Sequence, residues 1–422
     1  MNEPSVFSGP EVTMQKDVKH GEWEHRDVHN LYGLTFHRAT SMGLVERNPS
    51  KNVRPFVLSR AFFAGSQRHG AIWTGDNKAE WGHLEYAQPM LLSIGLTGLT
   101  FSGKFSLYFI SFYFFIYFVS FYFVSILFQF LIGADVGGFF GNPDVELLTR
   151  WYQAGAFQPF FRAHAHLDAK RREPFLYEEP HRSAMKNAIL ERYFLLPYWY
   201  TCFYHSYKTG VPTMRPMWVE YPKIQNTFTI DDQFFVGDSI LVKPITKPGV
   251  TSLDVFLPEE DVFYDYTTFR RFSGNTVVKT PIDKIVAFYR GGKIVPRQQR
   301  QRRSSTQMKD DPYTLIVALN QELSASGEIY FDDFVSFDHR NGVYHHRQFT
   351  FANNSLRSQH LSGSYKTNND IERIVVVGYP NQPSKIVSNG RNLEFEYDSQ
   401  LRVLTIRKPL LRISEDFTLN IN

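Results

Sequence analysis

The hydrophobic pattern of this chain changes its period once, and this change constrains the fold more than any other feature. In the first part, short apolar runs such as AIWTGD (residues 71–76) alternate with helical patterns such as the amphipathic stretch from Lys78 to about Ile94. This alternation is typical of βα units. From Phe228 onward, runs such as FTIDDQFFVGDSILVKPI indicate strands separated by turns. We therefore predict an α/β region followed by an all-β region.

Two breaks in the pattern divide the chain into three predicted domains. The first break falls near residues 216–221, where the α/β pattern ends, and the second falls in the polar, basic stretch 298–312. We predict an α/β domain over residues 1–215, followed by two small β-sandwich domains over residues 216–300 and 301–422.

Two further helices are predicted in the α/β domain. Asn142 followed by Pro143 indicates a helix start, because asparagine caps free N–H groups and proline lacks one. A long helix is predicted from about His181 to Tyr207.

The segment from Lys104 to Ile132 interrupts the α/β pattern. It is built almost wholly from Phe, Tyr, Ile, Val, Leu and Ser, with one charge at its first position. Its length and hydropathy would suit a membrane-spanning helix. However, its narrow composition resembles that of a translated non-coding stretch, and removing residues 104–133 joins TFSG to ADVGGFF. A single span would also leave the chain on the wrong side of the membrane. We favour a spurious insertion over a membrane helix.

Composition excludes several classes of protein. The net charge of +4 is small for 422 residues, and we interpret the basic run 297–303 as a solvated loop, so no nucleic-acid partner is predicted. Cys202 is the only cysteine, so no disulfide can form within the chain. The first ten residues lack the pattern of a secretory signal.

Charged and polar side chains follow four of the apolar runs. They are Arg60, Asp76, Asp135 and His164. In parallel strands of a barrel, the positions just after the strands form one rim, where active sites lie. Asp76 follows Trp73, and a carboxyl group among aromatic rings has its charged form disfavoured, which suits a general acid. The alternative, that Asp76 and Asn77 cap the next helix, fits the spacing equally well.

Longer motifs carry a resemblance to a known family. In the α/β part they are MNEPSVFSGPEVTM, WEHRDVHNLYG, RPFVLSRAFFAGSQR, WTGDN, GADVGGFF, RWYQAGAFQPFFRAHAHLD and RREPF. In the β part they are DDQFFVGDSILVKPI, FYRGGKIVPR, RRSSTQMKDDPYTLIVAL and GEIYFDD. Together they resemble glycoside hydrolase family 31, and within it the neutral α-glucosidases related to the catalytic subunit of glucosidase II. The resemblance implies the carboxyl-terminal part of a (β/α)8 TIM barrel, followed by the two β-sandwich domains.

The resemblance also implies roles for matched residues. Such enzymes use two aspartates about 5 to 5.5 Å apart, one as nucleophile and one as acid and then base. Asp76, in WTGDN, matches the acid/base. The residues implied to bind the terminal glucose are Arg60, His164, Asp135, Trp73, Phe139 and Met1. The residues of the same loop that match structural positions are His166, Asp168, Arg171 and Arg172.

The family nucleophile is the aspartate that precedes Met-Asn-Glu-Pro, and this sequence starts at that methionine, Met1. We therefore expect these 422 residues to lack the nucleophile and to be inactive on their own. Glu3 is an alternative nucleophile, but it lies two residues further along, so we expect it to point elsewhere and to serve a structural role. Phe334 stands where family members usually have glycine, so this turn is expected to differ.

The function implied by the resemblance is that of a retaining exo-α-glucosidase acting on terminal non-reducing α-linked glucose. The glucosidase II resemblance implies trimming of glucose from N-glycans in the endoplasmic reticulum lumen, beside a non-catalytic beta subunit. Asn353-Asn354-Ser355 is a glycan-acceptor triplet. No cofactor is implied. His345 and His346 suggest a metal by adjacency, but we see no accompanying carboxylate cluster and predict none.

Two rival functions are left open by the sequence. A chain with Asp76, Arg60 and His164 but no nucleophile could hold glucose without cleaving it. A membrane protein anchored by residues 104–132 is the second rival. Preference for α-1,3 or α-1,4 linkages is not determined by these residues.

Overall fold

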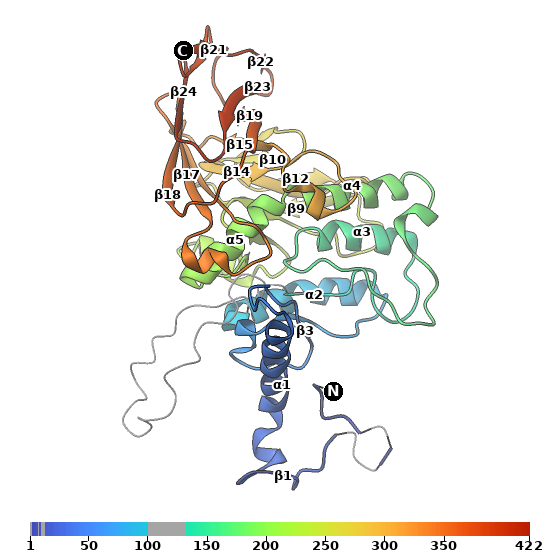
Figure 1. The fold of residues 1–422 in the computed structure, drawn as a ribbon. Helices are drawn as coiled ribbons and strands as arrows, with labels where there is room; N and C mark the ends of the chain where they lie inside the picture. The colour runs from blue at the N-terminus through green and yellow to red at the C-terminus, as the bar shows by residue number, and fades with distance from the viewer. Residues whose placement is uncertain (1, 7, 10–12, 100–131) are drawn as a thin grey trace.

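The computed structural model of the chain describes residues 2–6, 8–9, 13–99 and 132–422. Met1 and residues 104–131 lie outside the described residues, and so do the predictions that rest on them. Figure 1 shows an α/β part in blue to green, from which helix α1 (His25–Arg47) extends, and a β part in yellow to red. The predicted order of an α/β region followed by an all-β region is confirmed.

The α/β part contains a three-stranded parallel sheet in the order β3-β4-β5. Its strands are β3 (Leu58–Ser59), β4 (Ala71–Trp73) and β5 (Ile132–Gly133). The helices that follow α1 are α2 (Trp81–Ile94), α3 (Val145–Gly155), α4 (His181–Phe194) and α5 (Leu196–Thr209). A two-stranded hairpin, β1 (Lys19–His20) and β2 (Trp23–Glu24), precedes α1. Among the helices of the described residues, none is long and apolar enough to cross a membrane.

Three predicted helix boundaries differ from those in the structure. Helix α3 starts at Val145 and not at Asn142, because Oδ1 of Asp144 accepts the N–H of Leu147 at 2.8 Å and so provides the cap. The predicted long helix is divided at Leu195, and α5 restarts with a proline in its first turn. Helix α2 starts at Trp81, beyond the predicted Lys78.

The first β region is a six-stranded sheet in the order β11-β10-β13-β8-β7-β6, beside a two-stranded sheet of β9 and β12. Its strands are β6 (Met214–Pro216), β7 (Phe234–Val236), β8 (Ile240–Val242), β9 (Ser252–Val255), β10 (Phe263–Asp265), β11 (Arg271–Phe272), β12 (Thr276–Lys279) and β13 (Ala287–Arg290). A short helix, α6 (Met217–Glu220), follows β6.

The second β region is one sheet in the order β21-β20-β24-β18-β17-β16-β14-β15-β19-β23-β22. Its strands are β14 (Lys293–Arg297), β15 (Tyr313–Ala318), β16 (Ala325–Phe331), β17 (His345–Ala352), β18 (Ser355–Ser362), β19 (Asp370–Val377), β20 (Ile386–Ser388), β21 (Arg391–Asn392), β22 (Phe395–Asp398), β23 (Val403–Arg412) and β24 (Phe417–Ile421). The sheet begins at Lys293, before the predicted boundary at residue 300.

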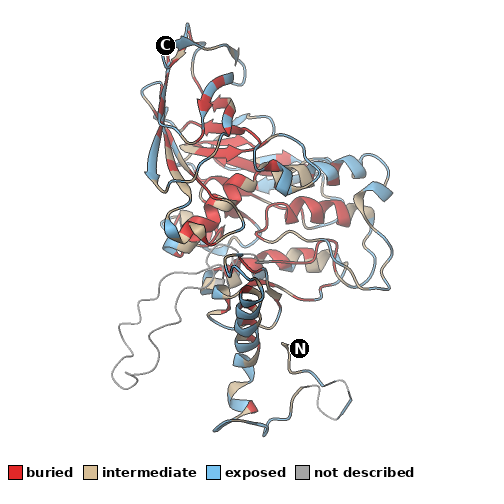
Figure 2. Cartoon of the chain, viewed as in Figure 1, coloured by how far each residue is buried: buried red, intermediate tan, exposed pale blue. Residues whose placement is uncertain are grey.

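The hydrophobic core is continuous across the predicted domain boundaries. Figure 2 shows buried residues along α3, α5 and both β regions. One cluster joins Trp199 of α5, Val236 of β7 and Val295 of β14. A second cluster, which includes Phe349 and Leu419, fills the β14–β24 sheet. The α/β part is therefore packed directly on both β regions.

The interpretation of residues 297–303 as a solvated loop is wrong for the first residue, Arg297. Arg297 ends strand β14 and is only 4% exposed. Its guanidinium donates to the Tyr289 hydroxyl at 2.8 Å and to the Glu191 carboxylate at 2.5 Å. Although Arg297 is the first residue of a basic run in the sequence, it can be buried in the sheet because Glu191 on α4 compensates its charge.

A buried ion pair joins the segment before β3 to the second β region. Arg54 Nη2 lies 2.6 Å from Asp332 Oδ2, and the two side chains are 1% and 0% exposed. The Tyr200 hydroxyl of α5 donates to Asp332 Oδ1 at 2.7 Å and accepts from Arg54 Nη1 at 2.7 Å. Three parts of the chain therefore meet at one buried carboxylate.

The turn that carries Asp332 contains a residue in an unusual conformation. Phe334 has a φ of +64°, in the left-handed region that glycine enters at low cost. Its N–H donates to Asp332 Oδ1 at 2.7 Å, and its ring packs 4.9 Å from that of Tyr200, centroid to centroid. The turn thus has the backbone conformation expected of glycine, and the phenylalanine ring packs on Tyr200, which bonds to both members of the ion pair.

Replacing Arg54 by Leu in the complete protein should lower the free energy of unfolding by about 3–5 kcal/mol, because Asp332 then stays buried without its guanidinium partner. The control is Arg407→Leu, which removes the exposed partner of Glu396 on strands β23 and β22 and should leave stability nearly unchanged. Urea titrations followed by tryptophan fluorescence measure both. Equal unfolding midpoints for the two variants would contradict this account.

Candidate active site

The parallel strands bring four predicted site residues to one rim. Arg60 follows β3, Asp76 follows β4 and Asp135 follows β5, with Leu58 opposite Ala71 and Trp73 opposite Gly133. A further parallel bridge pairs Val136 with Ala163, the residue before His164. Because parallel strands end at the same edge, the rim predicted from the apolar runs is present.

Arg60 holds two carboxylates at this rim. Its Nη1 lies 2.8 Å from Asp76 Oδ2, while its Nε and Nη2 donate to the Glu3 carboxylate at 2.5 and 3.1 Å. The hydrogen bond to Glu3 raises the pKa of the guanidinium, burial opposes this rise, and Asp76 adds to it. Glu3 therefore points at Arg60, as a structural role requires, and the three side chains fix one another's positions.

Asp76 does not cap a helix in this structure. The N-cap of α2 is Glu80, and the Asp76 carboxylate is directed to Arg60. Asn77 instead holds the next loop: its Oδ1 accepts the N–H of Phe139 at 2.8 Å, and its Nδ2 donates to the carbonyl of Asp135 at 3.1 Å. Asn77 is a positioning residue whose role the sequence did not indicate.

Asp135 is the most deeply buried carboxylate of the rim, at 1% exposure. Arg162 Nη2 donates to Oδ1 of Asp135 at 2.6 Å, and the guanidinium carbon of Arg162 lies 5.2 Å from the centroid of the Trp73 ring. Burial raises the pKa of Asp135, although Arg162 and His164 act in the opposite direction. The sequence singled out Asp135 and Trp73, but not the arginine between them.

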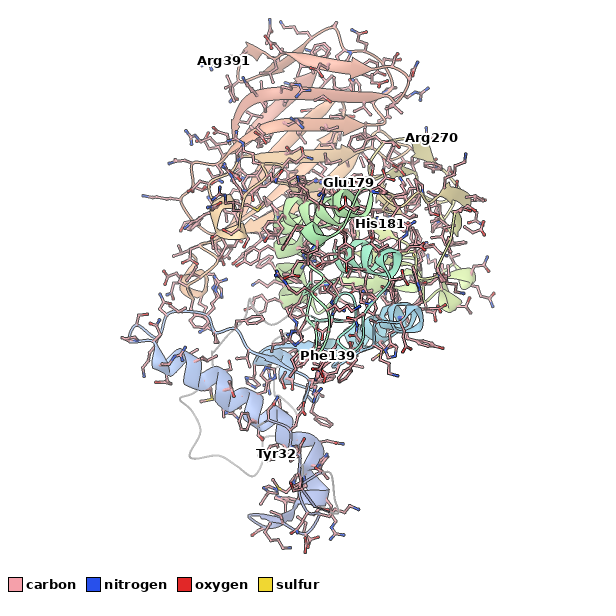
Figure 3. All side chains as sticks on the ribbon, turned by 90° about the vertical axis from the view of Figure 1, so that its right-hand side faces the viewer. Tyr32, Phe139, Glu179, His181, Arg270 and Arg391 are labelled. Atoms are coloured by element: carbon pink, nitrogen blue, oxygen red, sulfur yellow. The ribbon has the colours of Figure 1, made fainter. Side chains whose placement is uncertain are left out.

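Aromatic rings form the other wall of the rim. The Phe139 ring lies 5.2 Å from the His164 ring and 5.6 Å from the His166 ring, centroid to centroid. Figure 3 shows Phe139 in the α/β part, between Tyr32 of α1 and Arg391 of the second β region. His164 is exposed, so its ring is accessible to a ligand.

The loop residues predicted to be structural divide into two kinds. Arg172 donates to the carbonyls of Gly137 and His164, each at 2.8 Å, and so joins the two loops. Arg171 pairs with exposed Glu173, and Asp168 is 78% exposed beside His166. Arg172 therefore supports the rim directly, and so does His166, whose ring contacts that of Phe139 and whose backbone N–H donates to the Phe139 carbonyl at 3.0 Å.

Gly138 explains part of the GADVGGFF motif. Its φ is +77°, and a Cβ at this position would lie 2.3 Å from the backbone nitrogen of Ala79. The close approach of these two loops requires glycine, because any side chain would push Phe139 away from the rim.

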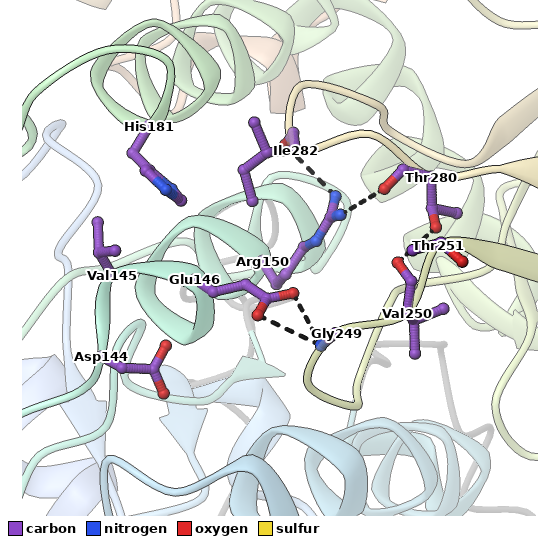
Figure 4. A pocket seen from close by; sticks show the side chains of 10 residues that line it. All are labelled: Asp144, Val145, Glu146, Arg150, His181, Gly249, Val250, Thr251, Thr280 and Ile282. Carbon is purple, nitrogen blue, oxygen red and sulfur yellow. Dashed lines mark hydrogen bonds between the residues drawn. The ribbon is translucent and has the colours of Figure 1, made fainter.

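A separate hollow lies between α3 and the first β region (Figure 4). Its lining residues are Asp144, Val145, Glu146, Arg150, His181, Gly249, Val250, Thr251, Thr280 and Ile282. None of these is a predicted site residue. Arg150 donates to the carbonyls of Thr280 and Ile282, at 2.7 and 3.3 Å, which shows a structural role in joining the two regions.

His345 and His346 do not form a shared site. As neighbours on strand β17 they point to opposite faces. The His345 ring packs against the rings of Phe331 and His360, whereas His346 contacts the carboxylate of Glu328. One carboxylate therefore accompanies His346, although the sequence shows no carboxylate cluster beside the pair.

The rim of these parallel strands carries carboxylates, an arginine and aromatic rings, an arrangement typical of barrel enzymes with acid–base chemistry. Residues 1–104 and 123–202 match the glycosyl hydrolases family 31 TIM-barrel domain, and residues 210–295 match the glycosyl hydrolase family 31 C-terminal domain. The chain belongs to glycoside hydrolase family 31.

Three similar proteins place the chain within this family. Neutral alpha-glucosidase AB of Dictyostelium discoideum is 51% identical over 433 residues, which cover 100% of this chain and 43% of that protein. The crystal structure of glucosidase II alpha subunit in its alpha3-Glc2-bound form has a TM-score of 0.88 and 44% identity, and covers 100% of this chain and 45% of that one. The ER glucosidase II heterodimeric complex of the catalytic subunit and the binding domain of the regulatory subunit has a TM-score of 0.87 and 43% identity, with 100% and 45% coverage. The chain thus spans less than half the length of these relatives.

The raised pKa of Asp135 gives a pH prediction. The pKa of Asp135 in the folded protein lies above its value of about 3.8 in the unfolded chain. Binding of this proton therefore stabilises the fold fully when the pH is below about 3.8. This stabilisation is lost as the pH rises through the pKa of the folded state. Compared with the native protein, Asp135→Asn should therefore become relatively more stable as the pH rises from about 4 to about 7.

Urea titrations across this range measure the difference, and Asp310→Asn, at an exposed position, is the control. If the stability curves of the native protein and Asp135→Asn stay parallel, burial does not raise this pKa.

Proposed function

We propose that the protein containing this chain is a retaining exo-α-glucosidase that hydrolyses terminal non-reducing α-linked glucose. The observation that carries the proposal is the Asp76 carboxylate, 27% exposed at the strand rim and held by Arg60 at 2.8 Å. The match of WTGDN to the family's acid/base motif and the neutral alpha-glucosidase among the relatives support it.

In this proposal Asp76 protonates the glycosidic oxygen as the bond to the anomeric carbon breaks. It then removes a proton from the water that hydrolyses the glucosyl-enzyme ester. The nucleophile that forms this ester is the aspartate expected before Met1, outside these 422 residues. On their own, the 422 residues are proposed not to complete the reaction.

The remaining rim residues bind the glucose ring in this proposal. Arg60 and His164 donate to its hydroxyls, while Asp135 accepts from one of them, with Arg162 holding the carboxylate in place at 2.6 Å. Trp73 and Phe139 offer apolar faces to the sugar. Met1 is proposed to flank the same subsite.

The finer biological role rests on the relatives. The alpha3-Glc2-bound structure supports α-1,3-linked glucose as the substrate. The ER heterodimeric complex supports a place in the endoplasmic reticulum beside a regulatory subunit. Trimming of N-glycan glucose is proposed from the resemblance to glucosidase II. All three assignments are proposals for the complete protein.

The test is Asp76→Ala in the complete enzyme. Substrates with poor leaving groups should slow by about 10²- to 10⁴-fold and activated aryl α-glucosides much less, because only the former need protonation. Added azide should yield α-glucosyl azide. Asp310→Ala, at an exposed position, should retain activity, and the 422-residue chain alone should release no glucose.

Rates and azide products are measured by chromatography. Equal slowing of both substrate types would mean that Asp76 is not the acid/base. Glucose binding without turnover by the complete protein would favour the sugar-binding alternative.

We also propose that residues 104–133 do not belong to the functional enzyme, in which Ser102 and Gly103 would directly precede Ala134 in place of β5 (Ile132–Gly133). The family match is interrupted at 105–122, which supports an insertion at this point. An aromatic and β-branched stretch without proline also favours aggregation.

Deleting residues 104–133 from the complete protein should raise both its soluble fraction and its glucose release from nigerose or maltose. Paired expression of the two forms measures this effect. If the form that keeps the segment is equally soluble and active, or stays active in membranes, the segment is a genuine element.

A further inference from the structure

Three side chains from distant parts of the sequence meet where α5 crosses the second β region. They are His205 of α5, Glu328 of β16 and His346 of β17, here called the His–Glu–His cluster. Glu328 Oε2 lies 2.5 Å from His346 Nε2 and 3.1 Å from His205 Nε2. One ligand atom from each residue lies within 4.8 Å of the other two.

The strand register and one aromatic stack fix this geometry. Glu328 pairs with Gln348 and Tyr330 with His346, so Glu328 and His346 are diagonal neighbours on one face of the sheet. Helix α5 is held on that face by Tyr204, whose ring stacks on Tyr330 at 4.0 Å and meets the His346 ring at 4.8 Å, centroid to centroid. His205, the next residue of α5, is thereby brought to the carboxylate.

The geometry of the cluster leaves a place for a cation. The Glu328 carboxylate lies between the imidazole nitrogens of His205 and His346. The side chains of His205, Glu328 and His346 are 34%, 27% and 14% exposed, so an ion and its water ligand can enter from solvent.

The donor set selects the kind of ion. Two imidazole nitrogens and one carboxylate oxygen are the three-residue set of open zinc sites, in which water takes the fourth position. Mg²⁺ and Ca²⁺ prefer sites made of oxygen ligands, and this cluster offers one carboxylate. Metal–ligand bonds of about 2.0–2.1 Å place tetrahedral ligand atoms roughly 3.4 Å apart, so small side-chain movements are sufficient.

We propose that His205, Glu328 and His346 bind one divalent transition-metal ion of the zinc class. The bound ion takes the place of the hydrogen bonds between the histidines and Glu328, and joins α5 to strands β16 and β17. A proton displaced from an Nε2 atom moves to Nδ1 of the same ring or is released to water. The site is independent of the proposed hydrolysis at Asp76, and its role is to hold the second β region against the α/β part.

The experiment is calorimetric titration of the complete, chelator-treated protein with Zn²⁺, followed by thermal unfolding with and without the ion. The native protein should bind one Zn²⁺ at the cluster, and the ion should raise its unfolding temperature. Loss of a residue that hydrogen-bonds to a metal ligand weakens metal binding by about 10- to 100-fold. His205→Gln and His346→Gln, which remove a ligand itself, should therefore weaken it by at least about 100-fold. Both variants should lose the rise in unfolding temperature.

Two further variants separate loss of the ligand from loss of the fold. Glu328→Gln keeps the side-chain shape and a hydrogen-bonding oxygen but removes the charge, and it should also weaken Zn²⁺ binding. His360→Gln, at an exposed histidine of β18, is the matched control and should bind Zn²⁺ as the native protein does.

A second histidine group allows a direct internal comparison. His20, His25 and His29 are linked by ring contacts of 3.0 and 2.7 Å near the start of α1. If Zn²⁺ binding persists in folded His205→Gln and His346→Gln but disappears when these three histidines are replaced, the proposal is wrong. Absence of Zn²⁺ binding by the native protein overturns it equally.

Discussion

The buried pair of Arg54 and Asp332 is the interaction on which the arrangement of the regions depends. Arg54 lies just before β3, the strand that leads to Arg60, while Asp332 lies just after β16. Tyr200 of α5 bonds to both side chains. A desolvated charge is stable only with its partner in place, so the β3 segment, α5 and the second β region must be held in one mutual position. This constraint places α5 across β16, where the His–Glu–His cluster also forms.

The rim itself is organised by residues that bond to backbone and to neighbouring carboxylates. Arg60 fixes Asp76 relative to Glu3, Asn77 holds the loop of Asp135 and Phe139, and Arg172 joins that loop to His164. Each contact joins two separate segments of the chain. The acid/base proposed for the glucosidase therefore depends on several positioning residues, because a reacting group must be held within about 0.5 Å of its productive position.

The two proposed sites use charge in different ways. At the rim, Asp76 stays partly exposed beside an arginine, so that a substrate can reach it. In the His–Glu–His cluster, the carboxylate is shared by two imidazoles, which are neutral ligands for a metal when deprotonated at the contacting nitrogen. The first arrangement suits proton transfer to a sugar oxygen, and the second suits holding an ion.

The sequence by itself determined the order of an α/β region and an all-β region, the family, and the presence of Arg60, Asp76, Asp135 and His164 at a strand rim. These follow from periodicity and from contiguous motifs, which are local properties of the chain. Only the tertiary structure decided the partners: Arg162 for Asp135, Asp332 for Arg54, and Glu328 with His205 for His346. It also decided that Arg297 is buried. Most of these partners are far apart in sequence, so packing and strand register, which no local pattern records, bring them within bonding distance.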